Sequence, residues 1–303
     1  MTFWIVQTLN GISFGMLLFL LAAGMSLIFG LIRVLNLAHG SFYLVGAYLA
    51  LTVLGYTRSF VLALVAAVAG VVLLGVVFER FIVRRIYGDE LRQALLTFGF
   101  LFMLGDLSLW IWGGNPQTLP KPEAFSGSLR VSGIVFPTYR LFVIVVGAFI
   151  GGGLWWLQEK TKLGAMIRAG VDDGEMARGM GINTSLLFTV VFALGAALAA
   201  FGGVLGGVIV GVHPGIDLEV LLFAFVVIII GGIGSIRGAF VAAVLVGLID
   251  TIGRAFLPDL LRLVLSSRGA STVAPAMSSM MIYLLMAIVL VLRPEGLFPV
   301  SSK

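Results

Sequence analysis

The sequence contains no cysteine and few charged residues. The absence of cysteine excludes disulfide bonds, thiolate metal sites and cysteine nucleophiles. Charged residues make up 11% of the 303 residues, against about a quarter in soluble proteins. Because 19 basic and 14 acidic side chains cannot cover the surface of a soluble protein of this length, the composition excludes an ordinary soluble enzyme.

Motifs for nucleotide binding and metal-dependent hydrolysis are also missing. The chain has no Gly-x-x-x-x-Gly-Lys-Ser/Thr loop, which would hold the phosphates of ATP, and no His-Glu-x-x-His helix. Its two histidines, His39 and His213, lie far apart and have no companion at a spacing typical of metal ligands. We therefore predict no catalytic residue, no cofactor and no metal site, and we expect any energy for work to come from partner subunits.

Hydrophobic residues, in contrast, form 60% of the chain, and glycine accounts for 40 residues. Glycine permits the close approach of helices in a membrane, where about 20 apolar residues span the bilayer. The sequence predicts an all-α polytopic membrane bundle, a single domain over residues 1–303 with about eight transmembrane helices, some of them broken by glycine. The apolar stretches are 12–31, 41–56, 60–78, 94–112, 141–157, 186–212, 220–230, 239–249 and 276–292, of which 220–230 and 239–249 are each too short to cross alone.

The basic residues gather in short loops rather than along one face, which argues against nucleic-acid binding. Lysine and arginine mark cytoplasmic loops, so we expect 79–92 and 158–185 inside, and the N-terminus and the proline-rich loop 113–139 outside. Residues 254–275 would lie outside if 231–238 is the turn of a hairpin that enters from outside. They would lie inside if it interrupts one broken span.

The loop 158–185 carries an ordered polar run that predicts a short helix. Met176 and Met180 are one turn apart and share a face, with Ala177 beside them. Such a helix at the membrane surface offers a compact protrusion for the groove of a partner, although a solvated connector has the same composition. The expected caps and charges at its ends are Asp172 or Asp173, Glu175 and Gly181.

Two glycine-containing segments, 31–40 and 231–238, interrupt the apolar stretches. Nonhelical backbone at membrane depth occurs where it is buried in protein or lines a cavity, and transporters often place substrate at such breaks. Free N–H groups at the following helix starts could bind a carboxylate. The alternative is that both segments are tight turns or close-packing points. The predicted substrate pathway comprises Asn36, His39, Gly40, Ser41, Gly231, Gly232, Gly234 and Ser235.

Asp106 and Asp250 lie within apolar stretches, where an ionisable residue indicates function by default. Two tryptophans follow Asp106 and place it near the outer interface, whereas Asp250 is near enough to a helix end to extend to the interface. We expect His39 to hydrogen-bond neighbouring backbone and His213 to lie in an external turn.

Four blocks of sequence carry a resemblance to a known family. They are Asn36-Leu37-Ala38-His39-Gly40; Gly164-x-x-x-Arg168-Ala169 followed by Glu175-x-Ala177-x-x-x-Gly181-Ile182; Gly231-Gly232-Ile233-Gly234-Ser235-x-x-Gly238; and Arg293-Pro294-Glu295-Gly296-Leu297-Phe298. In their order and spacing they resemble the permease subunits of branched-chain amino-acid ABC transporters, closer to the LivH type than to LivM.

The resemblance implies a permease subunit of an ATP-driven importer in the bacterial inner membrane that carries branched-chain or related hydrophobic amino acids. The implied partners are a second, LivM-like permease or a homodimer mate, two ABC ATPase subunits, a periplasmic substrate-binding protein and the lipid bilayer. Ser41 stands where relatives often carry an acidic residue, so urea, short amides and aromatic acids remain open as substrates. An ion-coupled secondary transporter or channel is the alternative of another class. The implied ATPase-coupling residues are Arg168, Asp172, Asp173, Glu175, Met176, Ala177 and Gly181.

Overall fold

The computed structural model describes residues 2–32, 36–131, 134–263 and 265–298. In these residues the chain forms eleven α-helices, two short 3-10 helices and one two-stranded hairpin, so the predicted helical bundle is confirmed. The elements are α1 (Thr2–Ile32), α2 (His39–Thr57), α3 (Phe60–Phe81), η1 (Val83–Ile86), α4 (Glu90–Trp112), η2 (Glu123–Phe125), β1 (Ser128–Val131), β2 (Ile134–Pro137), α5 (Thr138–Lys160), α6 (Lys162–Asp172), α7 (Gly174–Gly179), α8 (Thr184–Ile209), α9 (Ile216–Gly231), α10 (Ile236–Leu261) and α11 (Ser267–Leu292).

Short polar side chains define where several helices begin. The oxygen of each cap accepts a hydrogen bond from a backbone N–H in the first turn, which would otherwise have no partner. The apolar residues that follow then continue each helix until glycine or a loop ends it. The caps of α3, α4, α8, α10 and α11 are Ser59, Asp89, Asn183, Ser235 and Ser266.

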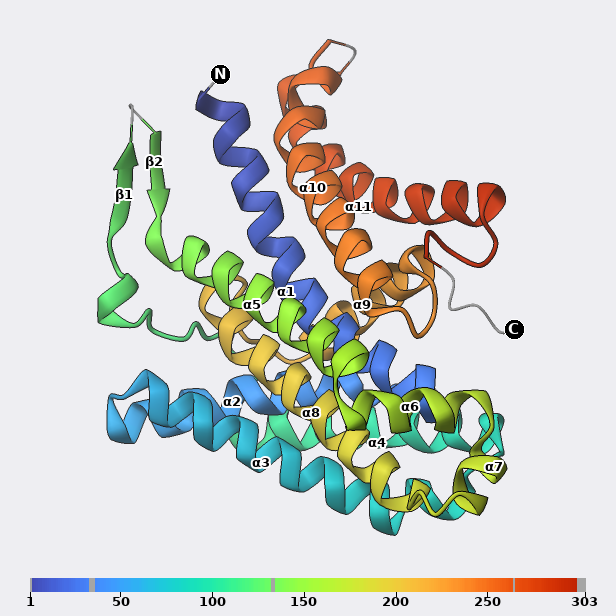
Figure 1. Cartoon of the computed structure of the whole chain (residues 1–303). Helices are drawn as coiled ribbons and strands as arrows, with labels where there is room; N and C mark the ends of the chain where they lie inside the picture. The colour runs from blue at the N-terminus through green and yellow to red at the C-terminus, as the bar shows by residue number, and fades with distance from the viewer. Residues whose placement is uncertain (1, 33–35, 132–133, 264, 299–303) are drawn as a thin grey trace.

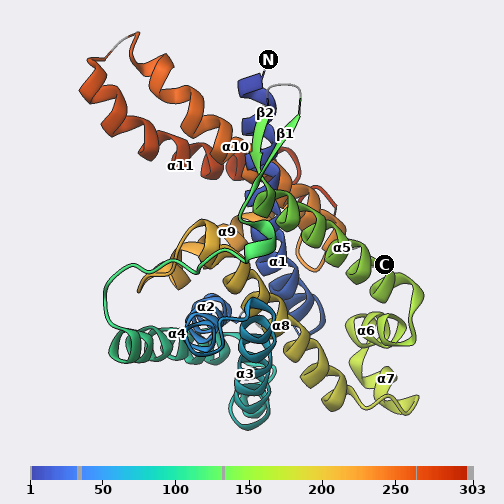
Figure 2. The same ribbon diagram turned by 90° about the vertical axis from the view of Figure 1, so that its left-hand side faces the viewer.

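The bundle has two distinct ends (Figure 1). At one end, Arg140 of α5 donates to Asn10 of α1 over 2.6 Å, next to the β1–β2 hairpin, and we call this the hairpin end. At the other, α6 and α7 project from the bundle, and we call this the α7 end. Figure 2 shows α6 and α7 standing apart from α2, α3 and α4. Arg237 at the start of α10 pairs with Glu159 at the last turn of α5 over 3.1 Å, which places the start of α10 at the α7 end.

α1 forms the centre of the bundle. Of its most apolar stretch, 83% is buried, against 17 to 22% for α3, α4 and α5, which present many exposed apolar side chains. Small residues permit this central position: Gly11 and Gly15 lie against the backbone of α10, and Gly24 lies against the carbonyl group of Gly195 in α8. Close backbone contact through glycine is typical of membrane helices. The glycine excess therefore serves helix packing.

Seven helices of the described chain are long and apolar enough to cross a membrane, and α11, which bends by 42° between Ala274 and Ala276, makes an eighth if it counts as one span. The stretch 239–249 was expected to be too short to cross alone, and this expectation is wrong. α10 extends it at both ends to 26 residues, because the helix starts at the Ser235 cap and continues through Pro258. α9, with 16 residues, stays short.

α9 and α10 form a helical hairpin whose turn is 232–235, not one broken span. α10 runs antiparallel to α1, since Gly15 packs against Ala243 and Gly11 packs against Leu248. The C-terminal part of α10 therefore lies at the hairpin end, together with the first turns of α1. Of the two arrangements expected for 231–238, the structure therefore shows the turn of a helical hairpin. Residues 254–263 and 265–275 then lie at the hairpin end of the bundle, together with the first turns of α1.

The loop between α4 and α5 contains an element that was not predicted. β1 and β2 pair antiparallel, with Ser128 opposite Pro137 and Val131 opposite Ile134. A separate bridge joins Gln117 to Val212, beyond the end of α8. The proline-rich loop is therefore fastened to the helical bundle on the hairpin end.

Candidate functional site

The first candidate site is the protrusion formed by α6 and α7. Asp173 caps α7, because its Oδ1 atom accepts hydrogen bonds from the N–H groups of Glu175 (3.0 Å) and Met176 (2.9 Å). After the helix, Gly181 has a φ of +85°, and the N–H of Ile182 donates to the carbonyl oxygen of Ala177 over 3.0 Å. This is a Schellman ending, and it contains the Gly181 cap that the sequence predicted. The caps at both ends are confirmed.

Only part of the predicted coupling set faces outward. Met176 and Met180 are 63% and 67% exposed, and Glu175, Asp172 and Asp173 are exposed beside them. Ala177 is fully buried, because α7 turns that face toward the bundle. Arg168 folds back and donates to the carbonyl oxygen of Gln158. The outward surface therefore joins two methionines and three carboxylates, and we call it the α7 surface.

A buried carboxylate connects the start of α8 to the end of α3. Glu79 is fully buried and accepts hydrogen bonds from Arg84 (3.1 Å), Tyr87 (2.7 Å) and Thr189 (2.8 Å). Burial first, and then the hydrogen bond to Glu79, raise the pKa of Tyr87 above its usual range, so its phenol keeps the proton that it donates. The cluster fixes α8 where it leaves the α6–α7 protrusion.

The first glycine-containing break brings α2 against α1 and α9. His39 bonds through Nε2 to the carbonyl oxygen of Leu21 over 3.0 Å, as predicted. Ser41 donates to Asp217 over 3.2 Å, and a Cβ on Gly40 would overlap the Asp217 carbonyl oxygen. The Asp217 carboxylate therefore occupies the place at Ser41 where a substrate carboxylate was expected. Asn36 is buried, and its amide has no hydrogen-bond partner among the described residues.

The second break is a turn at the α7 end. Gly232 and Gly234 have φ of +102° and +83°, which glycine adopts without strain, and Ser235 caps α10 by accepting from Gly238 over 3.0 Å. Gly231 packs on Gly238, so both must lack a side chain. The two breaks meet, because a Cβ on Gly30, just before the first break, would lie 2.9 Å from the Cα of Gly234.

The C-terminal residues complete this turn. The N–H of Leu297 donates to the carbonyl oxygen of Ile230 over 2.8 Å, and that of Phe298 to Gly231 over 3.0 Å. They supply partners for carbonyl groups at the end of α9 that have none within the helix. The Arg-Pro-Glu-Gly-Leu-Phe block therefore closes the C-terminal end of α9.

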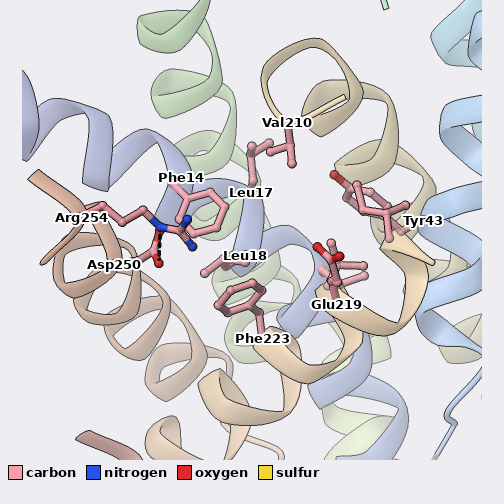
Figure 3. A pocket seen from close by; sticks show the side chains of 12 residues that line it. Phe14, Leu17, Leu18, Tyr43, Val210, Glu219, Phe223, Asp250 and Arg254 are labelled. Atoms are coloured by element: carbon pink, nitrogen blue, oxygen red, sulfur yellow. Dashed lines mark hydrogen bonds and ion pairs between the residues drawn. The ribbon is translucent and has the colours of Figure 1, made fainter. Parts of the chain in front are cut away.

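A cavity of about 260 Å³ lies among α1, α9 and α10, and the sequence analysis did not predict it (Figure 3). One face of α1 and one face of α9 line it at spacings of three and four residues, with two positions of α10 one turn apart. Those residues are Phe14, Leu17, Leu18 and Leu21; Ile216, Glu219, Val220 and Phe223; and Asp250 and Arg254. Tyr43 and Val210 complete the lining, and the Phe14 and Phe223 rings meet edge to face at 5.9 Å.

Charged groups stand at opposite sides of this otherwise apolar cavity (Figure 3). Arg254 Nε donates to both carboxylate oxygens of Asp250 at 2.9 Å. The Asp250 side chain is 8% exposed, so it does not extend to the interface as expected but is held in an ion pair. Glu219, on α9, faces the pair across the cavity. The sequence signal that could have predicted this ion pair was an Asp and an Arg one helical turn apart in an apolar stretch.

The other ionisable candidates lie away from these sites. Asp106 is exposed on α4 and makes no hydrogen bond or ion pair with a described residue. His213 lies in the turn before α9, where its Nδ1 atom is 3.2 Å from the carbonyl oxygen of Pro214. The expected turn at His213 is confirmed at the hairpin end of the bundle.

Known proteins resemble the chain over most of its length. The protein family described as "branched-chain amino acid transport system / permease component" matches residues 7–290. The high-affinity branched-chain amino acid transport system permease protein BraD of Pseudomonas aeruginosa is 28% identical over 264 residues, which cover 82% of this chain and 86% of BraD. LivH of Escherichia coli, with the same description, is 26% identical and covers 84% of this chain and 87% of its own. No solved structure matches the chain.

Proposed function

Because the chain belongs to the family of branched-chain amino acid transport system permease components, we propose that it is the permease subunit of an ATP-driven importer for branched-chain or related hydrophobic amino acids. As a multi-pass membrane permease, the chain supplies the pathway, and separate ATPase subunits supply the energy. The names of the relatives support this substrate class, and their similarity covers most of both chains.

The α7 surface is the observation that carries the ATPase-driven mechanism. Capped at both ends, α7 is a rigid element that presents exposed Met176 and Met180 at one end of the bundle. Flexible, polarisable methionines suit a hydrophobic groove on a partner. The surrounding carboxylates, Asp172, Asp173 and Glu175, add a charge pattern that a basic groove would recognise. We assign the ATPase contact to this surface, with Arg168, Ala177 and Gly181 as residues that hold its shape.

Motion of α7 would reach the bundle through α8. Arg178 of α7 donates to Thr184 at the start of α8 over 2.7 Å, and Ala177 is buried against the bundle. α8 in turn packs on α1 and α2, where Gly195 and Gly203 lie against Gly24 and Tyr43. Closure of the ATPases would thus rock α8 against α1 and α2, the helices that flank the first break, which is the alternating-access motion of transporters.

The positive-inside rule orients the subunit. Arg80, Arg84, Arg85, Lys160 and Lys162 lie at or beside the α7 end, so we assign that end to the cytoplasm and the hairpin end to the outside. The predicted location is the bacterial inner membrane. The hairpin end then faces a periplasmic binding protein, and a second permease, LivM-like or a second copy, completes the pathway.

Uptake by the reconstituted complex tests this function. In vesicles that contain both permeases, the ATPases and the binding protein, radiolabelled leucine should accumulate only with ATP. A competitor panel of isoleucine, valine, urea, short amides and aromatic acids then identifies the substrate class. Uptake that persists without the ATPase subunits would contradict the importer and favour an ion-coupled carrier or channel.

Substitution of the α7 surface tests the docking. Met176→Asp combined with Met180→Asp should reduce ATPase retention on purification by about tenfold or more, as expected for anchors at the centre of an interface. Met176→Leu combined with Met180→Leu, which keeps apolar side chains of similar size at both positions, is the matched control. Equal retention in the aspartate variant and the leucine control would place the ATPase contact elsewhere.

A further inference from the structure

We propose that the cavity among α1, α9 and α10 is a binding site for the α-amino acid inside the permease, where Arg254 binds its carboxylate and Asp250 its ammonium group. The inference rests on the proposed import function and names the place in the permease where the substrate binds. The substrate pathway predicted from the sequence lay at the glycine-containing breaks, whereas the lining residues of this cavity all lie outside 31–40 and 231–238.

Arg254 has free donors for a carboxylate. Only its Nε atom is used in the ion pair with Asp250, and neither terminal nitrogen donates to any other residue that the structure describes. The Arg254 side chain is 50% exposed and lines the cavity. Two parallel N–H groups of a guanidinium match the two oxygens of a carboxylate. A substrate carboxylate can therefore bind without breaking the existing pair.

Asp250 lies beside Arg254, as an amino acid requires. The ammonium and carboxylate groups of an α-amino acid are joined through one carbon atom, so an adjacent acidic and basic side chain can bind both groups at once. Asp250 and Arg254 meet this condition at 2.9 Å. Asp250 has no other partner among the described residues, so a carboxylate lone pair remains for an ammonium donor.

The rest of the cavity fits an apolar side chain of modest size. Leu18 and Phe223 lie between the ion pair and the far wall (Figure 3), and the edge-to-face contact of Phe14 with Phe223 closes the gap between α1 and α9. Its volume of about 260 Å³ is below the range of about 300–1,000 Å³ that holds drug-sized ligands. One leucine, isoleucine or valine is the class of ligand that combines this size with an apolar wall and a paired charge.

Glu219 gives the site its selectivity. It is exposed in the cavity, and none of the described residues donates to its carboxylate. An unpaired carboxylate among apolar walls repels a substrate with an acidic side chain at that position. Glu219 therefore rejects aspartate and glutamate, while the ion pair on the opposite wall accepts the groups that all α-amino acids share.

The position of the cavity supports entry of the substrate from the outside. Asp250 and Arg254 lie beyond Leu248, the α10 residue that packs on Gly11 near the start of α1, so the ion pair is in the half of the bundle toward the hairpin end. That end is the one assigned to the outside. An ionisable group at membrane depth is stable where it is paired or faces water, and both conditions hold for a water-accessible substrate site.

A single introduced cysteine tests occupancy, because the chain has none of its own. Val210→Cys, at a cavity-lining residue that is 47% exposed, should react with a soluble maleimide in the purified complex, and millimolar leucine should slow the reaction at least about threefold. Val135→Cys, exposed on β2 outside the cavity, is the control and should react at the same rate with or without leucine. No protection at Val210→Cys would overturn the proposal.

Protection of the same cysteine by leucine analogues, and by leucine in charge variants, then shows which charged residue binds which group of the substrate. Leucine should protect, whereas 3-methylbutylamine, which lacks the carboxylate, and 4-methylpentanoate, which lacks the ammonium, should need at least about tenfold higher concentration. Arg254→Gln, and the double variant Asp250→Asn with Arg254→Gln that leaves no orphan charge, should lose protection by leucine. Glu219→Gln should gain protection by glutamate.

The outcomes separate this proposal from the import function. A wild-type complex that lacks ATP-dependent uptake would refute the import function itself. Leucine uptake at the wild-type rate in a folded Arg254→Gln complex that still binds the ATPases would refute the site alone. Equal protection by leucine and 3-methylbutylamine would also refute it, because the carboxylate would then make no contact.

Discussion

Ser41 donates a hydrogen bond to the Asp217 carboxylate over 3.2 Å, and this contact joins the first turn of α2 to the first turn of α9. The carbonyl oxygen of Leu101 in α4 lies 3.3 Å from the same hydroxyl and shares its single proton, so three helices meet at one hydroxyl group. Both Ser41 and Asp217 are buried. A buried carboxylate with few donors depends on each of them.

Ser41→Ala should therefore destabilise the protein by about 1–3 kcal/mol, because the Asp217 carboxylate loses a donor that water cannot replace. The midpoint of thermal unfolding in detergent measures this loss. Ser128→Ala, at an exposed serine of β1, is the control and should change stability by about 0.5 kcal/mol or less. Equal midpoints for the two variants would show that the Ser41 contact contributes nothing.

Gly40→Ala should destabilise the protein by about 1–3 kcal/mol or more, because the new methyl group overlaps the backbone of Asp217 and neither helix can retreat without opening the core. Gly99→Ala, in α4, has open space around it and should stabilise its helix by up to about 1 kcal/mol. We expect the midpoint of unfolding to fall below that of the wild type for Gly40→Ala and to rise above it for Gly99→Ala. A neutral Gly40→Ala variant would contradict the close contact.

Gly234→Val should abolish uptake while ATPase binding persists. The φ of +83° disfavours a β-branched residue, and position 234 lies at the close contact with Gly30 where the two breaks meet. Gly113→Val has a similar φ of +80° but no neighbour within 4 Å, so it separates backbone strain from contact between the breaks. Vesicle uptake decides: a loss confined to Gly234→Val supports a working pathway at the breaks, and unchanged uptake in that variant contradicts it.

Glu79→Leu should destabilise the protein by about 2–3 kcal/mol. This loss is smaller than that for a fully buried ion pair, because the Arg84 side chain is 30% exposed. Three donors, from Arg84, Tyr87 and Thr189, lose their shared acceptor. Asp259→Asn removes an exposed ion pair with Arg262 and should cost about 1 kcal/mol at most. Urea unfolding of both variants measures the difference, and equal costs would show that the Glu79 cluster is not a stabilising contact.

Much of the helical fold follows from local sequence. Every predicted apolar stretch lies largely within a helix, because an apolar run in lipid has no other way to satisfy its backbone. The α7 caps were predictable because Asp173 and Gly181 act on their own neighbours. The full length of α10 was not, since Asp250 and Arg254 made its second half resemble a helix end when each charge was considered alone.

The sites depend on contacts that sequence spacing does not encode. Nothing near Ser41 in the sequence indicates Asp217, and the cavity needs faces of α1, α9 and α10 to be brought together in three dimensions. The burial of Ala177 also depends on how α7 lies against the bundle. Periodicity predicts that two residues share a face of one helix, but it does not predict which way that face turns.

The two hydrogen bonds from Leu297 and Phe298 to the end of α9 limit how early the α9–α10 turn can fold during synthesis. Synthesis proceeds from the N-terminus at about 5–20 residues per second, so α9 leaves the ribosome before its closing residues exist. Until then the carbonyl groups of Ile230 and Gly231 lack the partners that they have in the finished protein. The α9–α10 turn, although it precedes α11 in the sequence, can reach its final form only after α11 has been translated.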